Sequence, residues 1–425
     1  MSSQVLRQNR SPLVVLATAG TLGDLWPVLS LGQTLLQRGV RVRLSAPKSF
    51  LPHARMLGIE TCESRPHVTA HYVRRHAGSW DHWGKMESGE LLWGCPDVID
   101  LKGRYSDLMA AVQGAELFIP TSTQFLGSLV AEKTGIPSLT IAISPQHVAS
   151  LPGSLNSVKS QFLESSITMP PLLKGKGLVH LGEHLREFRS SIGLSGESKN
   201  PLFCNSPVIA AISSHFCEPD REKFPDIAFT GFWFYQRPEW NDWLPSRTFE
   251  RFLEKGTPPL VLTFSSLPLC DSESVLKTHA QAAMLLSRRL VIISGWAGFD
   301  KRDIPQECRG EVIVVGELPH QWLFMRSAAV IHHGGIGTLA ESLRCRKPML
   351  IEPYGNDQFF NASRAIKLGI GAAAHPHRMT PEALARLLDS KVLSPETSQR
   401  VSSLAENILK DSGVEYAADL VMARL

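Results

Sequence analysis

The residues with the clearest chemical potential lie in the segment 330–361. A short apolar stretch precedes Gly334, Gly335 and Gly337, and an amphipathic stretch begins near Thr338, which predicts a strand, a tight turn and a helix. Glycine has no Cβ, so backbone N–H groups at the start of this helix can point outward at an anion, and the helix dipole also favours negative charge there. We therefore predict that the turn binds a phosphate group.

Polar side chains flank this turn. His332 and His333 stand just before the glycines, where ring N–H groups can donate hydrogen bonds to pyrophosphate oxygens. Asp357 and Gln358 follow the next apolar segment, and parallel strands place such residues at one edge of their sheet. A glycine-rich turn alone occurs in many strand–helix–strand units, but here the turn and both pairs lie in one unit. Together they predict a ligand with a phosphate at one end and hydroxyl groups at the other.

A second candidate for chemistry is Asp24, in the loop GTLGDLWP that follows the apolar segment 13–17. Proteins with α/β folds place their chemistry at such strand ends. The loop is not G-x-G-x-x-G, and no acidic residue ends the next strand, so a dinucleotide cofactor is disfavoured. Asp24 also has a structural interpretation, because a carboxylate can cap a helix that starts at Pro27. The two roles are compatible.

The elements that must position these groups alternate along the chain. We expect strands at 13–17, 40–45, 117–120, 138–143 and 208–213, and then at 260–264, 290–294, 312–315, 328–331 and 348–352. Helices separate most of them, including one at 27–38 and a closing helix at 395–425. Such alternation is typical of doubly wound parallel sheets. We predict an α/β fold with two Rossmann-like domains: an N-terminal domain at 1–217, a Pro- and Trp-rich linker at 218–245, a C-terminal domain at 246–400 and a final helix at 401–425.

Length and composition are consistent with this organisation. A chain of 425 residues with 43% hydrophobic content can bury two cores. Forty-four basic residues against forty acidic ones give a formal charge of +4 without a basic run, so nucleic acid is a disfavoured partner. The seven cysteines are scattered and odd in number, which favours reduced thiols in the cytoplasm. The first residues lack an apolar signal region, and no apolar run reaches the roughly 18 residues of a spanning helix. We expect a soluble cytoplasmic protein with at most peripheral membrane contact.

Two motifs resemble those of a known family. The loop at 20–27 and the unit at 332–361 are similar to the family-1 glycosyltransferases of GT-B fold, above all to the bacterial and fungal branch that includes sterol, antibiotic and rhamnolipid glycosyltransferases. In that family the Asp of the first loop, here Asp24, is considered the base that deprotonates the acceptor. The second unit binds the nucleotide-diphosphosugar. The resemblance covers nearly the whole chain and implies that the last helix crosses back onto the first domain.

The resemblance and the strand-end positions together name the donor contacts. Ser266 follows a strand, and an ordinary strand-to-helix turn is its alternative role. The loop 316–322 stands where relatives hold the base, which points to backbone groups of Leu318 and to Trp322, although core packing is the favoured interpretation of Trp322. The predicted donor set is Gly23, Ser266, Trp296, Leu318, His332, Gly334, Gly335, Gly337, Thr338, Asp357 and Gln358.

The acceptor pocket is expected in two less regular segments. Histidines and tryptophans crowd the stretch 49–102, and the stretch 144–182 is long, apolar and rich in Ser, Pro and Gly, as functional lids and binding loops are. For most single residues there, a surface segment with a few buried aromatics is the simpler interpretation. As lining of an apolar acceptor pocket we name Trp80, Trp83, Trp93 and Phe162.

One position departs from the family pattern. Members that hold a ribose hydroxyl with a Glu carry it eight residues after the first motif His. Counted from His332, this position is Ala340, and Glu341 is one place off. A UDP-sugar is favoured as donor by the resemblance, and a dTDP-sugar stays open.

The predicted function is inverting glycosyl transfer from a nucleotide diphosphate sugar to a hydroxyl of a lipophilic small molecule, such as a natural product, phenol, sterol or hydroxy-lipid. Asp24 would take the proton of this hydroxyl while its oxygen attacks the anomeric carbon opposite the departing diphosphate. No Asp-x-Asp sequence occurs, so we predict neither a metal ion nor a cofactor. The alternatives are a nucleotide-sugar epimerase or phosphorylase of the same fold, and a non-catalytic nucleotide-sugar-binding partner protein.

Overall fold

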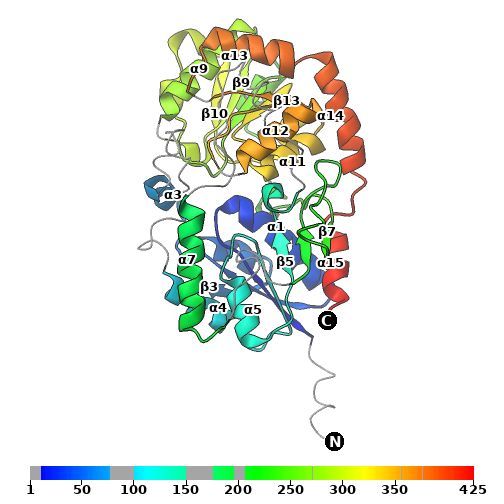
Figure 1. Ribbon diagram of the computed structural model, residues 1–425. Coiled ribbons are helices and arrows are strands. Elements are labelled where there is room, and N and C mark those ends of the chain that lie inside the picture. Colours follow the sequence, from blue (N-terminus) through cyan, green and yellow to red (C-terminus); the bar gives the residue numbers. More distant parts are fainter. Residues whose placement is uncertain are drawn as a thin grey trace, which may run out of the picture.

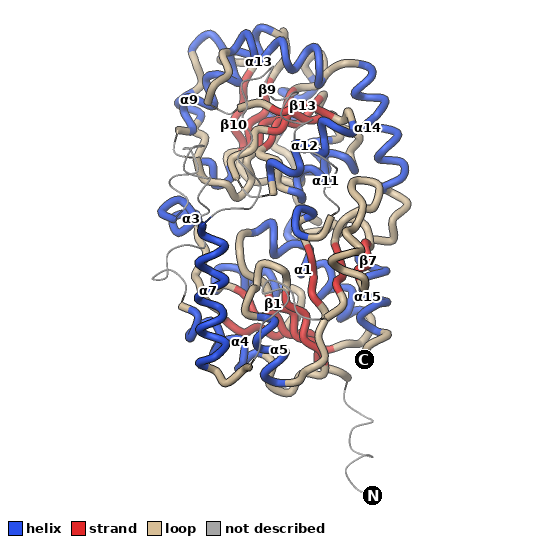
Figure 2. The backbone as a smooth tube through the Cα atoms, in the orientation of Figure 1, coloured by secondary structure: helices blue, strands red, loops and turns tan. Residues whose placement is uncertain are grey.

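The computed structural model describes residues 11–76, 100–149, 176–195, 206–269, 271–355, 357–375 and 377–425. Within them the chain forms two halves, each with a parallel sheet between layers of helices (Figures 1 and 2). The central strands are fully buried runs of apolar residues, as parallel sheets covered on both faces require.

The first half contains seven parallel strands. The first four have the order β3-β2-β1-β4 and the next three the order β5-β6-β7. Isolated parallel bridges from Phe118 to Ser138 and from Thr121 to Ile141 join the two groups at β4 and β5. The strands are β1 (Leu13–Ala17), β2 (Arg41–Ala46), β3 (Glu60–Glu63), β4 (Leu117–Pro120), β5 (Thr140–Ala142), β6 (Val208–Ala210) and β7 (Ile227–Phe229).

The second half contains one parallel sheet of order β10-β9-β8-β11-β12-β13. In its centre Ile331 of β11 pairs with Leu262 of β8 on one side and with Leu350 of β12 on the other. The strands are β8 (Leu260–Thr263), β9 (Leu290–Ile293), β10 (Val312–Val315), β11 (Ala329–His332), β12 (Met349–Ile351) and β13 (Gly371–Ala373).

Helices cover both faces of each sheet (Figure 1). In the first half they are α1 (Leu22–Gln37), α2 (Leu51–Met56), α3 (Ala70–His76), α4 (Leu101–Ala111), α5 (Gly127–Thr134) and α7 (Lys176–Ser191). In the second half they are α8 (Arg247–Glu254), α9 (Ser272–Leu285), α10 (His320–Phe324), α11 (Ile336–Arg344), α12 (Gln358–Leu368), α13 (Pro381–Leu387) and α14 (Pro395–Ile408), while the last helix, α15 (Val414–Met422), lies on the first half. None of the described helices is long and apolar enough to cross a membrane.

Each sheet changes its winding direction once, and this fixes where ligands bind. The order reverses between β1 and β4 in the first half and between β8 and β11 in the second. In doubly wound sheets the carboxyl ends of the strands at such a point diverge and leave room for a ligand. The loops after these four strands are therefore the places where the fold positions functional groups.

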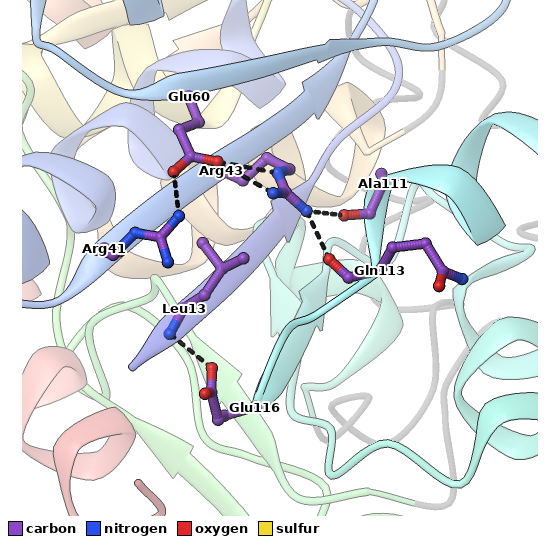
Figure 3. A network of polar contacts seen from close by, with 7 residues as sticks. All are labelled: Leu13, Arg41, Arg43, Glu60, Ala111, Gln113 and Glu116. Atoms are coloured by element: carbon purple, nitrogen blue, oxygen red, sulfur yellow. Dashed lines mark hydrogen bonds and ion pairs between the residues drawn. The ribbon is translucent and has the colours of Figure 1, made fainter. Parts of the chain in front are cut away.

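The opposite edge of the first sheet carries a structural network (Figure 3). Glu60 accepts hydrogen bonds from Arg41 at 2.6 Å and Arg43 at 3.0 Å. Arg43 also donates to the carbonyl of Ala111 at the end of α4, at 2.8 Å, while Glu116 accepts from the backbone N–H of Leu13. Each exposed ion pair of this kind contributes little to the stability of the fold. The network ties the amino ends of the strands together, away from the switch point.

The two halves share contacts along one side. Arg364 of α12 donates to the carbonyl of Phe216 at 2.6 Å, and one apolar cluster contains residues of the β6–β7 region and of α11, α12 and α14. The red helix α15 returns to the lower half in Figure 1 and packs on α1. There Arg38 pairs with Glu415 and Asp419, both at 2.6 Å.

Several predicted boundaries differ from the structure. Helix α1 begins at Leu22 rather than at Pro27, because a capping box starts it earlier, and α11 begins at Ile336 rather than near Thr338. The expected single helix at 395–425 is two helices, which are separated at Gly413 with φ +58°. Three short strands, β3, β7 and β13, were not predicted. All three are outermost in their sheets, and such short outer strands carry a weak periodic signal.

Candidate active site

Asp24 lies at the switch point of the first sheet. Thr21 is the N-cap of α1, and Asp24 is the third helical residue. Its Oδ2 accepts the backbone N–H of Thr21 at 2.8 Å, which is half of a capping box. The carboxylate is therefore held by the helix start next to the end of β1. The structural and the chemical role predicted for Asp24 use the same placement.

Gly20 makes room for this carboxylate. Its backbone has φ +107° and a Cβ there would stand 2.3 Å from Oδ2 of Asp24. A side chain would be strained by the positive φ and would also displace the carboxylate. The spacing Gly20–Asp24 is thus required by the geometry of the loop.

We predict that Gly20→Ala reduces turnover by at least about tenfold and destabilises the fold by about 1–3 kcal/mol, because a strained backbone costs about that much. The matched control is Gly39→Ala, at the other end of α1, where φ is +80° but a Cβ would meet no atom within 4 Å. Thermal unfolding and steady-state kinetics of both variants check this. Equal turnover in the two variants would show that the contact with Asp24 has no effect on the reaction.

The second half brings Asp357 toward Asp24. Burial raises the pKa of Asp24 to about 7, the N–H of Thr21 opposes the shift, and the charge of Asp357 raises the pKa further. Burial also raises the pKa of Asp357 to about 6, against the amide of Asn361 and the hydroxyl of Ser144. Ser144 follows β5 of the first half. The carboxyl groups of Asp24 and Asp357, one from each half, are therefore close enough to interact electrostatically.

The two histidines stand at the switch point of the second sheet. His332 ends β11 and is fully buried, with Nδ1 accepting the backbone N–H of Gly334 at 3.1 Å. In the neutral tautomer assigned from this bond the proton is on Nε2. Nε2 of His332 and Nδ1 of His333 are buried and have no hydrogen-bond partner among the described residues. Burial lowers the pKa of His333 to about 4 and that of His332 well below its ordinary value, so both rings act as neutral groups.

The three glycines of the turn differ in what a side chain at each position would meet. Gly334 has φ +94°, and a Cβ on it would lie 2.7 Å from Ile351. A Cβ on Gly335 would lie 2.5 Å from Nε2 of His333, and one on Gly337 would meet nothing within 4 Å. Gly335 is the N-cap of α11, and its carbonyl accepts from the N–H of Leu339. The N–H groups of residues 336–338 precede that bond and have no helical acceptor, as an anion seat requires.

Known proteins with similar sequences and structures are glycosyltransferases or match a family of antibiotic biosynthesis. A family described as "Erythromycin biosynthesis protein CIII-like, C-terminal domain" matches residues 285–421. Glycosyltransferase GtfE of Amycolatopsis orientalis is 29% identical over 96% of this chain and 97% of its own. A sterol 3-beta-glucosyltransferase of Debaryomyces hansenii is 24% identical over 99% of this chain, which spans only 28% of that protein. The solved structure of the kitacinnamycin glycotransferase has a TM-score of 0.73 at 20% identity and covers 98% of this chain and 100% of its own.

The chain is similar to the family-1 glycosyltransferases, and its fold is that of the solved GT-B glycosyltransferases. The expected fold class is confirmed by the same comparison. It is a glycosyltransferase enzyme.

In this glycosyltransferase Gln358 has a narrower role than the sequence predicts. Its Oε1 accepts the backbone N–H groups of Tyr354 at 2.7 Å and Gly355 at 3.0 Å. The carbonyl oxygen is thus used to hold the loop between β12 and α12. The side-chain amide N–H groups are what Gln358 can offer to a ligand.

Asn361 is a functional candidate that the sequence analysis did not select. Its Nδ2 donates to the carbonyl of Gly334 at 2.8 Å and to Oδ2 of Asp357 at 3.2 Å. It therefore connects the phosphate turn with the carboxylate. The available signal was its spacing, because Asn361 stands one helical turn after Asp357 and so on the same face of α12.

The loops after β8 and β9 interlock beside this turn. Ser265 has φ +53°, and its carbonyl accepts the N–H of Trp296 at 2.9 Å. A Cβ on Gly295 would lie 2.5 Å from that carbonyl. Ser266 is half-buried next to this contact, and the Trp296 ring packs on the apolar core of the first half. Ser266 is thus placed at the end of β8 as predicted, and Trp296 lies between the halves.

The remaining predicted residues differ in how close they lie to this site. Leu318 is buried in the core, so only its backbone can face a ligand, and Trp322 packs edge-on against Trp243 at 5.1 Å. Core packing is therefore the structural role of Trp322. Thr338 is buried in the first turn of α11, while Gly23 is exposed in the first turn of α1. The predicted acceptor residues Trp80, Trp83, Trp93 and Phe162 lie outside the described residues.

The structure shows the surroundings of Ala340, the position counted from His332, and of its neighbour Glu341. Ala340 is buried in an apolar cluster and faces the core, so it cannot meet a ligand. Glu341 is half-buried, and burial raises its pKa against the nearby Arg344 at 3.6 Å. Counted from His333 instead of His332, Glu341 is the eighth residue.

Proposed function

We propose that this glycosyltransferase moves a sugar from a nucleoside diphosphate to a hydroxyl of a lipophilic small molecule, with inversion and without a metal ion. The observation that carries the proposal is the proximity of Asp24 and Asp357, one from each half, which interact electrostatically. It supports a carboxylate of the first half that faces the phosphate turn of the second. The epimerase, phosphorylase and non-catalytic alternatives have no observation of their own in their favour.

The geometry supports a single displacement. The diphosphate would lie on the free N–H groups of residues 336–338, with the histidine N–H groups as further donors. These groups stabilise the charge that grows on the leaving diphosphate as the sugar becomes oxocarbenium-like. Asp24 takes the proton of the acceptor hydroxyl from the opposite side. Attack opposite the leaving group inverts the anomeric carbon.

The carboxylate of Glu341 supports a donor with a free ribose hydroxyl, so a UDP-sugar is the favoured donor. A dTDP-sugar is the second candidate, because the solved glycosyltransferase VinC, described in complex with dTDP, has a TM-score of 0.61 at 16% identity and covers 97% of this chain and 99% of its own.

We propose no metal because the chain lacks an Asp-x-Asp pair. The relatives include a sterol 3-beta-glucosyltransferase and an O-mycaminosyltylonolide 6-deoxyallosyltransferase of Streptomyces fradiae, which favours a lipophilic alcohol as acceptor. The cytoplasm stays the predicted location, and peripheral membrane contact stays a prediction.

A donor screen tests the proposal. Purified protein with a chelator receives UDP- and dTDP-sugars one at a time with lipophilic alcohols and phenols, and released nucleotide is quantified. Release that depends on acceptor, with an inverted product, is the expected result. Release without acceptor would favour epimerase-type or hydrolytic chemistry, and binding without release would favour a non-catalytic protein. Activity that the chelator abolishes and a divalent ion restores would refute metal independence.

The pH profile gives an independent prediction. Asp24 must be ionised to accept a proton, and its pKa is raised to about 7. Turnover should therefore rise with pH, level off above about pH 7 and fall about tenfold per unit below that value. Because the charge of Asp357 raises this pKa, Asp357→Asn should move the midpoint to lower pH, whatever its effect on the maximum rate. A profile that is flat between pH 5 and 8 would contradict the role of Asp24.

A further inference from the structure

Arg104 is a buried cation in the acceptor half that the proposed reaction does not yet use. It lies on α4 with a relative exposure of 6%, and its guanidinium stands over the ring of Phe125 at 4.5 Å. Its Nε is enclosed and has no hydrogen-bond partner in the part of the chain that the structure describes. Charged groups are almost never buried unless they are paired. An arginine without a carboxylate at this depth needs an explanation.

The neighbouring carboxylates are occupied elsewhere. Asp100 and Asp107 both pair with Arg65, at 2.7 Å and 3.1 Å. Neither forms an ion pair with Arg104 in the described part of the chain. Burial lowers the pKa of Arg104 to about 10, against Tyr72 and the two aspartates, and the group stays charged at neutral pH.

Arg189 shows how this half satisfies a structural arginine. It lies on α7 and is also 6% exposed. Both of its terminal nitrogens bond Glu132, at 2.6 and 2.5 Å, and one also bonds the carbonyl of Ser195. Two arginines of equal solvent exposure therefore differ: Arg189 has a bidentate carboxylate, whereas Arg104 has none among the described residues.

Arg104 lies at the same edge of the first sheet as Asp24, the proposed base for the acceptor hydroxyl. Phe125, which it covers, lies in the loop after β4, at the switch point of the first sheet. Thr123 of the same loop donates to the carbonyl of Ala19 at 2.8 Å, and its hydroxyl lowers the pKa of Asp24. Arg104 and Asp24 thus both contact the loop after β4, through Phe125 and Thr123 respectively.

We propose that Arg104 binds an anionic group of the acceptor, so that the acceptor class is a lipophilic hydroxy acid carrying a carboxylate. The inference rests on the glycosyl transfer proposed above. A planar guanidinium with five N–H donors matches a carboxylate bidentately. The Phe125 ring and the apolar surroundings suit the remainder of such a molecule. The aliphatic or aromatic body would then place its hydroxyl at Asp24.

The first test measures binding without any donor. Dodecanoate and its methyl ester are titrated calorimetrically into the full chain and into the variants Arg104→Met, Arg104→Lys and, as a surface control on α2, Arg55→Met. We expect the wild type and the control to bind the acid about 10- to 100-fold more tightly than the ester, as a charge-assisted pair allows. Arg104→Met should bind both alike, and Arg104→Lys should keep part of the preference. Equal binding by the wild type, or a preference that survives in Arg104→Met, would overturn the proposal.

The second test uses transfer, with hydroxydodecanoates whose hydroxyl stands near, midway along and at the far end of the chain, each as acid and methyl ester. Acid-selective turnover that Arg104→Met abolishes is the expected result. Equal turnover of acids and esters in both proteins would leave the glycosyltransferase intact and refute the anion site. Acid-selective binding without any transfer would support the anion site and refute the proposed function.

A stability measurement separates binding from structure. An unpaired buried charge disfavours the folded state, whereas breaking a buried pair is destabilising. Arg104→Met should therefore melt at the wild-type temperature or above it, and Arg189→Met below it. Dodecanoate should raise the melting temperature of the wild type only. If the melting temperature of Arg104→Met fell as far as that of Arg189→Met, and its preference for the acid over the ester were unchanged, Arg104 would be a structural residue.

Discussion

Replacing Asp24 with Asn is expected to lower turnover by roughly 10²- to 10⁴-fold, the usual contribution of general base catalysis, while the donor still binds. The amide cannot take a proton from the acceptor hydroxyl. Its oxygen can still accept the N–H of Thr21, which Asp24 bonds at 2.8 Å, so the start of α1 should stay intact. Donor affinity by calorimetry and turnover with acceptor distinguish binding from chemistry.

The control for this variant is Asp271→Asn. Asp271 caps α9 and accepts the N–H of Ser274 at 3.1 Å, so it loses the same charge at a helix start outside the site. Turnover of this variant should match the wild type. If Asp24→Asn turned over at a near-normal rate, Asp24 would be only a capping residue and another base would have to exist.

The second large effect is expected at His332. Its Nε2 is buried without a partner among the described residues, so it can donate to a phosphate oxygen. Removing one such donor typically costs about 10²- to 10³-fold in rate. His332→Ala should therefore weaken donor binding and turnover together. It also removes the acceptor of the Gly334 N–H, which loosens the turn.

Donor dissociation constants measured by calorimetry check this effect. His184→Ala is the matched control, because His184 lies on α7 with a side chain that is 38% exposed. His333→Ala tests the neighbouring ring, whose Nδ1 is also unpartnered. An unchanged donor dissociation constant in His332→Ala would remove this histidine from the site and leave the backbone N–H groups as the phosphate seat.

Local patterns predicted the central elements well. The strands at 13–17, 117–120 and 312–315 were placed at their observed bounds, because buried parallel strands are continuous apolar runs between turn residues. The start of α1 was placed too late, since Pro27 was taken as the first residue of the helix. The capping interaction between Thr21 and Asp24 is a contact of side chain and backbone, and it outweighs that preference.

The candidate site was only partly visible in the sequence. The glycines, the histidines and the Asp-Gln pair could be recognised in the sequence, because few residue types can form a tight turn, donate to a phosphate or bind a hydroxyl group. The interactions of Gln358 with Tyr354 and Gly355, and the bridge that Asn361 makes from Gly334 to Asp357, depend on how β12 and α12 pack. The same holds for Ala340, which is an ordinary helix residue until packing turns it into the core.

The sequence by itself determined the alternation of strands and helices, the glycine turn and the presence of Asp24 at a strand end, because these follow from local periodicity and residue chemistry. Only the tertiary structure decided that Asp24 and Asp357, separated by most of the chain, come close enough to interact, and that Arg104 is buried without a carboxylate partner among the described residues. Burial and proximity depend on which surfaces meet. No local sequence pattern encodes burial or proximity. They determine the pKa of Asp24 and whether Arg104 has a charged partner.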